Sequence, residues 1–338
     1  MRSLIKTLLV TLLLLLSLTT AASIYAWRWL QQPVTTAPGG MFEVMRGASV
    51  SSIAKQLQQA GWVKHPQIWS LWARYQRLGN KIKAGEYALT PGLSPDKLLQ
   101  LLSSGNVILR SLTIVEGSTY ADLRRALQQR QDIRHTIDQL SDAEVMQLLG
   151  LSGVHPEAQF FPDTYQFAKG INDLDILRMA QQRMQRELTT AWSARATDLT
   201  LASAYEALIL ASIIEKETAL PSERPLIAGV FVERLARGMR LQTDPTVIYG
   251  LGKNYDGNVH KADLLRDTPY NTYTRNGLPP TPICLPGAAA LRAAVNPQRT
   301  GAIYFVATGK GDGSHYFSRA LNEHNAAVQR YLNQLRAQ

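Results

Sequence analysis

Cysteine and histidine chemistry is nearly absent from this sequence. Its one cysteine, Cys284, excludes an intramolecular disulfide framework and a cysteine-based zinc site. The six histidines are scattered along the chain without a close ligand pair, and there is no GxSxG motif. We therefore predict neither a metal site nor a cofactor.

Acidic residues are also in short supply. The chain of 338 residues carries 26 Asp and Glu against 36 Lys and Arg, which gives a net charge of +10. This imbalance favours an acidic partner, that is, nucleic acid, anionic lipid or an anionic polymer. Because hydrophobic residues make up 45% and charged residues 18%, general disorder is excluded and two or three folded domains are expected.

Charge is missing altogether from a stretch near the N-terminus. Residues 7–27 are uncharged and include a run of five leucines. As a helix they would extend about 30 Å, which is the hydrocarbon thickness of a bilayer. Arg2 and Lys6 precede the stretch and only Arg28 follows it closely. The positive-inside rule therefore places residues 1–6 in the cytoplasm and the bulk of the chain outside.

Two interpretations of this stretch remain open. Tyr25, Trp27 and Trp29 are typical of the aromatic belt at a membrane interface, which favours an uncleaved single-pass anchor. The small residues at 20–23 would instead suit a cleaved signal peptide. Both interpretations export the chain and argue against nucleic acid as a partner. We expect a bacterial inner-membrane protein whose bulk is periplasmic, where anionic lipid and cell-wall polymer are available.

The exported part is predicted to be α+β, and its beginning is partly repetitive. Residues 28–40 are predicted to be a linker, because 31–40 (QQPVTTAPGG) has no charge and is rich in Pro and Gly. A pattern of two apolar residues, a turn glycine, a hydroxyl residue and two further apolar residues then occurs twice, 70 residues apart. Its positions are Phe42, Val44, Gly47, Ser49, Ile53 and Leu57, then Leu112, Ile114, Gly117, Thr119, Leu123 and Leu127. Each copy predicts a strand, a turn and a capped helix, although coincidence is the alternative.

The further elements are predicted from periodicity and from turn residues. The small portion, residues 41–105, should contain a helix at 66–79, a strand at 84–87 and a helix capped by Ser94. For the large portion, residues 106–338, we expect helix at 119–150, an aromatic turn and strand at 160–167, helices across 171–218, a segment dense in Gly and Pro at 238–287, a strand at 303–307, a hairpin turn at 309–313 and a helix at 321–336.

The candidate chemistry lies at the end of an apolar helix. Residues 207–214 are apolar nearly all round, which predicts a buried helix, and Glu215, Lys216 and Glu217 follow directly. Carboxylates two positions apart point about 200° from one another on a helix, so these two should face different walls. The helix dipole and apolar neighbours raise the pKa of a carboxyl placed there, as a general acid near neutral pH requires. The alternative is an ordinary solvated helix end.

Two loop segments carry groups that suit a sugar. Residues 242–245 (QTDP) and 270–273 (YNTY) supply amides, hydroxyls and aromatic faces. Sugar hydroxyls need hydrogen bonds, and the apolar face of a sugar ring stacks on aromatic side chains. Ordinary polar loops contain the same mixture, so this pattern alone does not decide between the two.

Five motifs, in this order, resemble those of the MltG/YceG-like endolytic murein transglycosylases. They are FPDTY at 161–165, ASIIEKE at 211–217, LQTDPTVIYG at 241–250, YNTY at 270–273 and GLPP at 277–280. The resemblance implies a single-pass inner-membrane protein with a LysM-like module at 41–105 and a catalytic domain at 106–338. It also implies a lyase that cuts peptidoglycan strands internally and terminates the elongation of nascent strands.

The resemblance assigns the catalytic role to Glu217, the second acid of the family's Glu-x-Glu motif. Glu215 matches the first acid and is a candidate substrate-binding residue. The remaining candidates for positioning the substrate are Gln242, Asp244, Asn271 and Tyr273. The chain departs from the family pattern after Pro280, where Thr281 and Leu285 stand in place of the usual Gly and Asn.

The implied mechanism needs one acid. It protonates the glycosidic oxygen between MurNAc and GlcNAc and then, as a carboxylate, takes the proton of the muramyl C6 hydroxyl as that oxygen attacks C1. The product is a 1,6-anhydro-MurNAc end, and no second carboxylate is required. The implied partners are peptidoglycan strands, the inner membrane and the penicillin-binding-protein synthases. Two alternatives stay open: a non-catalytic peptidoglycan-binding scaffold for synthases, and a lysozyme-like hydrolase with Asp244 as its second carboxylate.

Overall fold

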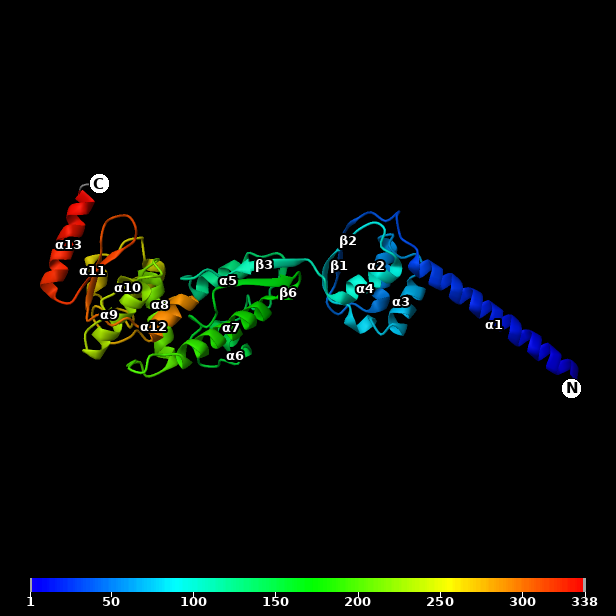
Figure 1. Ribbon diagram of the computed structural model, residues 1–338, viewed down its shortest axis with the longest axis horizontal. Helices are drawn as coiled ribbons and strands as arrows, with labels where there is room; N and C mark the ends of the chain where they lie inside the picture. Colours follow the sequence, from blue (N-terminus) through cyan, green and yellow to red (C-terminus); the bar gives the residue numbers. More distant parts are fainter. Residues whose placement is uncertain (1, 337–338) are drawn as a thin grey trace. The chain divides into compact units, whose positions relative to one another are not determined.

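The computed structural model describes residues 2–336, with side chains from Leu4 onward, and has α+β architecture (Figure 1). Its contacts divide the chain into two compact units. The N-terminal unit comprises the residues up to Arg110 together with Gln166–Ile171. The C-terminal unit comprises Ser111–Tyr165 and the chain from Asn172 onward. The domain boundaries expected from the sequence, at 40/41 and 105/106, stay a prediction.

A long apolar helix begins the chain. Helix α1 covers Arg2–Gln31, and its part from Leu4 to Gln31 is long and apolar enough to cross a membrane. Its apolar window of 18 residues has a mean hydropathy of 2.1 and is not buried. The same properties are found in signal sequences, so both interpretations remain compatible with this helix. The helix extends beyond Trp27 into the residues expected to form a linker, and Leu30 near its end is 2% exposed.

A two-stranded antiparallel sheet and three helices make up most of the rest of the N-terminal unit (Figure 1). Strands β1 (Gly40–Val44) and β2 (Gly85–Leu89) pair antiparallel, with Phe42 opposite Tyr87. The helices are α2 (Val50–Gln59), α3 (Pro66–Tyr75) and α4 (Pro95–Ser104), with a 3-10 turn η1 (Gly79–Lys81). Trp69 and Tyr87 are fully buried at the centre, where the Trp69 indole donates to the Pro95 carbonyl at 2.9 Å.

The N-terminal unit also contains a segment from later in the chain. Lys169 lies in the returning stretch Gln166–Ile171, and its ammonium group contacts Glu43 at 2.8 Å and Glu86 at 3.1 Å. Glu86 is buried and is also paired with Arg110 at 2.6 Å. These basic partners hold the pKa of Glu86 below its usual value, with Arg110 as the main cause.

The repeated strand–turn–helix pattern is confirmed. The first copy forms β1 and α2, and the second forms β3 (Leu109–Thr113) and α5 (Tyr120–Gln128). The hydroxyls of Ser49 and Thr119 accept hydrogen bonds from backbone amides three residues later, as N-caps do. Both turn glycines, Gly47 and Gly117, have positive φ angles, of 79° and 76°, which other residues rarely adopt.

Other predictions needed correction. The expected helix at 119–150 is wrong across its middle, because α5 ends at Gln128, β4 (Ile133–Arg134) follows, and α6 covers only Asp142–Leu148. The buried carboxylate of Asp173 accepts hydrogen bonds from the amides of Thr136 and Ile137, which holds this stretch out of a helix. The loop expected at 242–245 is partly helical, because α10 (Asp244–Leu251) begins inside it. The segment rich in Gly and Pro at 238–287 also contains η2 (Gly252–Asn254) and α11 (Lys261–Leu265).

The remaining elements include the helix that carries the two candidate acids. They are β5 (Thr164–Ala168), β6 (Ile171–Asn172), α7 (Asp173–Ser193), α8 (Ala204–Glu217), α9 (Arg224–Ala236), α12 (Ala288–Val295), β7 (Tyr304–Ala307), β8 (His315–Ser318) and α13 (Leu321–Arg336). Helix α8 packs against α7, α9, α10 and α12, and every residue from Ala207 to Ile214 is buried, which confirms the predicted core helix (Figure 1). The β7–β8 hairpin and α13 are also confirmed.

The packing of Trp69 allows a test of whether the two units are stabilised independently. Replacement by alanine should leave a cavity and destabilise the N-terminal unit by about 3–5 kcal/mol. Hydrogen exchange of the W69A variant should then show loss of protection in β2 and α4, with α8 unchanged. Equal loss of protection in α8 would contradict independent cores.

Candidate active site

Glu217 is the last residue of α8. The next residue, Thr218, has an extended backbone with φ −146° and ψ 137°, so the helix ends directly after the acid. The Glu217 side chain is partly exposed, and one of its carboxylate oxygens accepts a hydrogen bond from the hydroxyl of Thr243. The acid is therefore held at one end of a buried helix while part of it stays open to solvent.

The surroundings of Glu217 favour its protonated form. Burial raises its pKa to about 7, the hydrogen bond from Thr243 acts in the opposite direction, and the negative charge of Asp244 raises it further. A carboxyl group that titrates near neutrality can both donate a proton and take one back at physiological pH. This is the electrostatic condition that general-acid chemistry requires.

Thr243 holds its hydroxyl toward Glu217 because its backbone is fixed. It is the N-cap residue of α10, yet its side chain makes no capping hydrogen bond. Its amide donates to the Thr272 hydroxyl at 3.1 Å, and its carbonyl accepts from the Thr246 hydroxyl at 2.8 Å. All three threonines are buried, so they form a polar cluster that joins α10 to the loop before residue 273.

Gln242 precedes this cluster with an unusual backbone. Its φ of 53° lies in the left-handed region, where residues other than glycine are strained. The buried guanidinium of Arg234 offsets this backbone strain, because it donates to the Gln242 side-chain oxygen and to the Leu241 carbonyl, both at 2.8 Å. Gln242 is exposed, but its side-chain carbonyl is already bonded within the protein.

Asp244 and Tyr273 form a pair beside the acid. The Tyr273 hydroxyl donates to an Asp244 oxygen at 2.6 Å. Burial and this negatively charged neighbour raise the pKa of Tyr273, and the charge of Glu217 acts in the same direction. Asp244 is exposed, whereas Tyr273 is half-buried, so both can be reached from solvent next to Glu217.

The Asn271 side chain forms its hydrogen bonds within the protein. Only 1% of it is exposed, and its amide group donates to the carbonyls of Asp263, Leu264 and Arg266 at 2.7–3.1 Å. Its side-chain oxygen accepts from the Tyr273 amide at 2.8 Å. Asn271 therefore shapes the loop that presents Tyr273.

Glu215 faces a different wall from Glu217, as the two-residue spacing predicts. Its side chain is 5% exposed, pairs with Arg224 at 2.9 Å and accepts from the Gly287 amide at 2.9 Å. Burial raises the pKa of Glu215, and the bonds to Gly287 and Arg224 oppose that rise. A Cβ atom at Gly287 would lie 1.8 Å from a Glu116 oxygen, so a larger residue there would displace the Glu116 carboxylate. Glu215 thus ties the end of α8 to α9 and α12.

Sequence reasoning missed a second carboxyl group with a shifted pKa. Glu157 is 3% exposed, and burial raises its pKa to about 7. It accepts from the Tyr120 amide at 2.9 Å and from the Tyr249 hydroxyl at 3.0 Å. It therefore connects the start of α5 to α10, the helix that begins beside Glu217. No local sequence pattern marks it, because both partners are distant along the chain.

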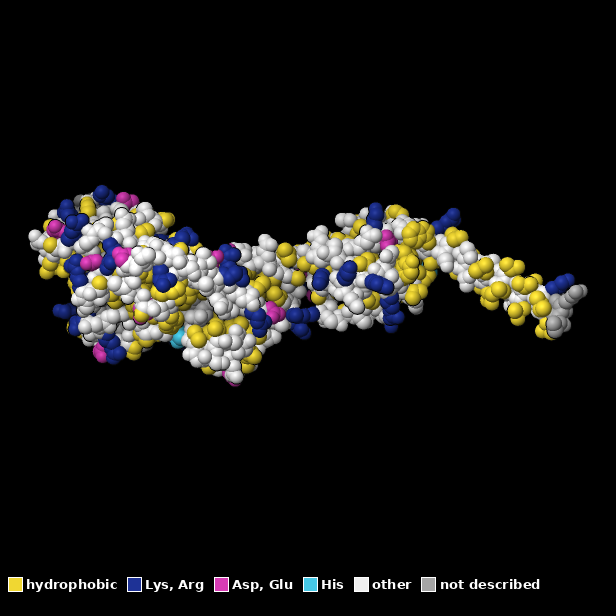
Figure 2. All heavy atoms as spheres, turned by 60° about the horizontal axis from the view of Figure 1, so that its bottom comes forward, with side chains coloured by type: hydrophobic (Ala, Val, Ile, Leu, Met, Phe, Trp, Pro, Cys, Tyr) yellow, Lys and Arg dark blue, Asp and Glu magenta, His cyan; other side chains and the backbone are white. Residues whose placement is uncertain are grey.

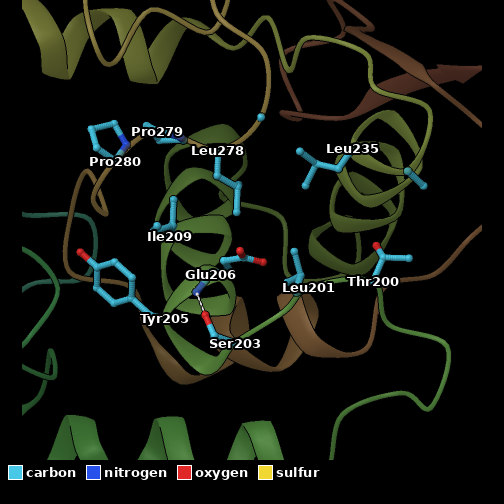
Figure 3. Close-up of a pocket in the computed structure, with 12 residues that line it drawn as sticks. Thr200, Leu201, Ser203, Tyr205, Glu206, Ile209, Leu235, Leu278, Pro279 and Pro280 are labelled. Carbon is cyan, nitrogen blue, oxygen red and sulfur yellow. Dashed lines mark hydrogen bonds between the residues drawn. The ribbon is translucent and has the colours of Figure 1, made fainter.

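A cavity of about 530 Å³ lies at the other end of α8 (Figure 3). Its lining includes Tyr205 and Glu206 from the first turn, Leu235 from α9 and the motif Gly277–Pro280. Ile209, the cavity residue furthest along α8, lies about 12 Å of helix rise before Glu217. The cavity and the acid are thus separate features, linked by the loop that carries Tyr273.

Among the described residues, one group of three has the composition of a metal site. Potential ligand atoms of His135, Asp138 and Asp173 lie within 4.8 Å of one another. The Asp173 carboxylate already accepts hydrogen bonds from four donor groups, namely the amide and hydroxyl of Thr136 and the amides of Ile137 and Leu174. Because these bonds explain its burial, we assign no metal there.

Glu217 defines a candidate general-acid site in this α+β fold. It is a partly buried acid at a helix end, and it lies next to a loop that supplies hydroxyl and amide groups. The comparisons with known proteins give this site a family. The model of the YceG-like family matches residues 42–330, and the chain therefore belongs to that family.

The similar proteins carry consistent names. The chain is 31% identical over 304 residues to the endolytic murein transglycosylase of Bacillus subtilis (strain 168), covering 85% of this chain and 83% of that protein. It is 30% identical over 324 residues to the endolytic murein transglycosylase of Streptococcus pneumoniae serotype 2 (strain D39 / NCTC 7466), covering 86% of this chain but only 58% of that protein. A crystal structure of a yceG-like protein from Listeria monocytogenes matches with a TM-score of 0.51 and 29% identity, over 86% of this chain and 99% of the other.

The two shifted carboxyl groups predict how stability depends on pH. Their pKa values rise from 4.5 to about 7 on folding, so the stability they contribute is complete below pH 4.5 and is lost as pH rises through 7. Each contributes up to about 3 kcal/mol to this change. Urea unfolding at pH 5 and pH 8 should show a smaller loss for E217Q and for E157Q than for the wild type. An unchanged loss in either variant would contradict the raised pKa of that group.

Proposed function

We propose that this chain is a membrane-anchored endolytic lytic transglycosylase that cleaves the bond between MurNAc and GlcNAc inside peptidoglycan strands and leaves 1,6-anhydro-MurNAc ends. The observation that carries the proposal is the carboxyl group of Glu217, partly exposed at the end of α8 with a pKa raised to about 7. The names of the relatives supply the substrate class.

In this proposal Glu217 acts twice. Its protonated form gives a proton to the glycosidic oxygen as the bond to C1 breaks. The resulting carboxylate then accepts the proton of the C6 hydroxyl while that oxygen bonds to C1, so the acid is restored and no water is consumed. The Thr243 hydroxyl stabilises the carboxylate between the two steps, because it donates to it directly.

The neighbouring groups have supporting roles. Asp244 and Tyr273 stand beside the acid and are accessible, so they are assigned to contact with sugar hydroxyls. Gln242 is assigned to the same surface through its free amide hydrogens. Asn271 and Glu215 are assigned to positioning, because their polar atoms are bonded within the protein.

The proposal extends to location and partners. Helix α1 is assigned as an uncleaved single-pass anchor in the bacterial inner membrane, with the bulk of the chain in the periplasm. Residues 41–105 are assigned as a LysM-like module and 106–338 as the catalytic domain. Acting next to penicillin-binding-protein synthases, such an enzyme would terminate the elongation of nascent glycan strands.

The experiment that tests this proposal compares two glutamate-to-glutamine variants of α8. E217Q keeps the size of the side chain but removes the proton, and its rate of glycan cleavage should fall by roughly a hundredfold or more. E206Q, at the opposite end of the same helix, should retain wild-type activity. Mass spectrometry of purified glycan strands after incubation would measure both the rate and the chemical nature of the new ends.

The same assay separates the alternatives. Anhydro ends lost only in E217Q support the proposal. New reducing ends would instead identify a hydrolase, with Asp244 as its second carboxylate. No new ends from the wild type would identify a binding scaffold. Undiminished activity of E217Q would remove the acid from the mechanism.

The hydroxyl of Thr243 predicts a shift in the pH profile. Activity should fall as pH rises above about 7, because the first step needs protonated Glu217. In T243V the hydrogen bond that stabilises the carboxylate is lost, which raises the pKa of Glu217. The pH at which activity falls should therefore move upward by about one pH unit. T246V removes a hydroxyl from the same buried cluster that does not contact Glu217. The pH at which its activity falls should equal that of the wild type. A common shift in both variants would contradict a direct role for Thr243.

A further inference from the structure

Aromatic contacts join the end of α1 to α3 within the N-terminal unit. The Trp27 ring packs edge-on against Trp72, with centroids 5.8 Å apart, and Trp72 stacks on Tyr75 at 5.5 Å. The Trp72 indole also donates to Asp96 at 2.7 Å, which fixes its orientation. A continuous row of rings therefore leads from the last turns of α1 along α3.

A second set of contacts fixes the start of α3. A hydrogen bond of 3.2 Å joins the Tyr25 hydroxyl and His65 Nε2, and the Trp29 ring packs against the same imidazole at 5.2 Å. Leu30 next to them is buried. The end of α1 is thus packed on the N-terminal unit rather than connected to it by a free linker.

The outer face of α3 is apolar and exposed. Leu71 is 68% exposed and Tyr75 is 76% exposed, and their spacing of four places them on one face of the helix. Figure 2 shows hydrophobic side chains gathered where α1 meets the N-terminal unit. Large side chains left in water next to an apolar helix indicate a surface that contacts something else.

The stretch of sequence that contains α3 carries charge of one sign. Between Glu43 and Glu86 the sequence contains seven basic residues and no acidic one. All seven are exposed: Arg46, Lys55, Lys64, Arg74, Arg77, Lys81 and Lys83. Figure 2 shows dark blue side chains spread over the N-terminal unit beside the hydrophobic ones. A basic surface around exposed aromatic and aliphatic side chains is typical of proteins that lie on anionic membranes.

We propose that α3 lies in the headgroup layer of the bilayer that α1 crosses, so that the N-terminal unit is seated directly on an anionic lipid surface. The inference rests on the proposed anchor role of α1. Lipid is favoured over glycan or a second copy of the chain because the ring row Trp27–Trp72–Tyr75 continues from the part of α1 that exits the membrane. Arg74 and Arg77, on and just after α3, then face lipid phosphates.

Site-directed spin labels on the full chain in lipid nanodiscs test whether α3 lies in the headgroup layer. Cysteines are introduced at Leu71, Tyr75 and, as a control, Ala88, which is exposed on β2. Cys284 is buried, so the wild type serves as the labelling blank. In discs with anionic lipid, labels at 71 and 75 should lose accessibility to a water-soluble nickel complex and gain accessibility to oxygen, whereas a label at 88 should not.

A charge variant and a label within α1 complete the test. Replacing Arg74 and Arg77 by glutamine should lower the ratio of membrane-bound to unbound N-terminal unit roughly thirtyfold in anionic discs. A label at Leu14 reports whether α1 crosses the membrane. If that label is not immersed in lipid, the anchor role fails. If Leu14 is immersed but positions 71 and 75 are not, only the proposal that α3 lies in the headgroup layer is overturned. Protection at 71 and 75 that appears only with added glycan, or only in discs holding two copies, would also overturn it.

Discussion

The burial of α8 along its whole length determines the chemistry at its end. Residues 207–214 are enclosed by four other helices, so the helix can neither shift nor rotate without opening the core. The position of its final carboxyl group is therefore set by packing that is remote from that group. A hydroxyl from α10 and the loop carrying Tyr273 then meet an acid whose place is already fixed.

The two acids of α8 show how partners decide a carboxyl group's role. Glu215 and Glu217 belong to the same helical turn, and burial raises the pKa of both. Glu215 is met by a guanidinium group and a backbone amide, which compensate its charge and occupy its oxygens. Glu217 is met by one hydroxyl and a neighbouring negative charge, so its proton is retained near neutral pH and can be exchanged.

Much of the fold follows from local patterns in the sequence. The apolar run of α8, the caps Ser49 and Thr119 and the hairpin before α13 depend on neighbouring residues, so they could be predicted. The break after Gln128 depends on Asp173, and the raised pKa of Glu157 depends on Tyr120 and Tyr249. Those partners are 35 or more positions away, and no periodicity encodes them. The bond from Thr243 to Glu217 was missed for the same reason, although the motif that contains Thr243 was recognised.

The returning segment Gln166–Ile171 has a consequence for how this architecture can be recombined. Lys169 closes two ion pairs in the N-terminal unit, although most of the chain between Arg110 and Lys169 belongs to the other unit. A gene fusion that exchanged the small unit at a single junction would leave Glu43 and the buried Glu86 without that ammonium group. Modular exchange therefore needs two junctions, and homologues with grafted N-terminal units should carry both segments from the same donor.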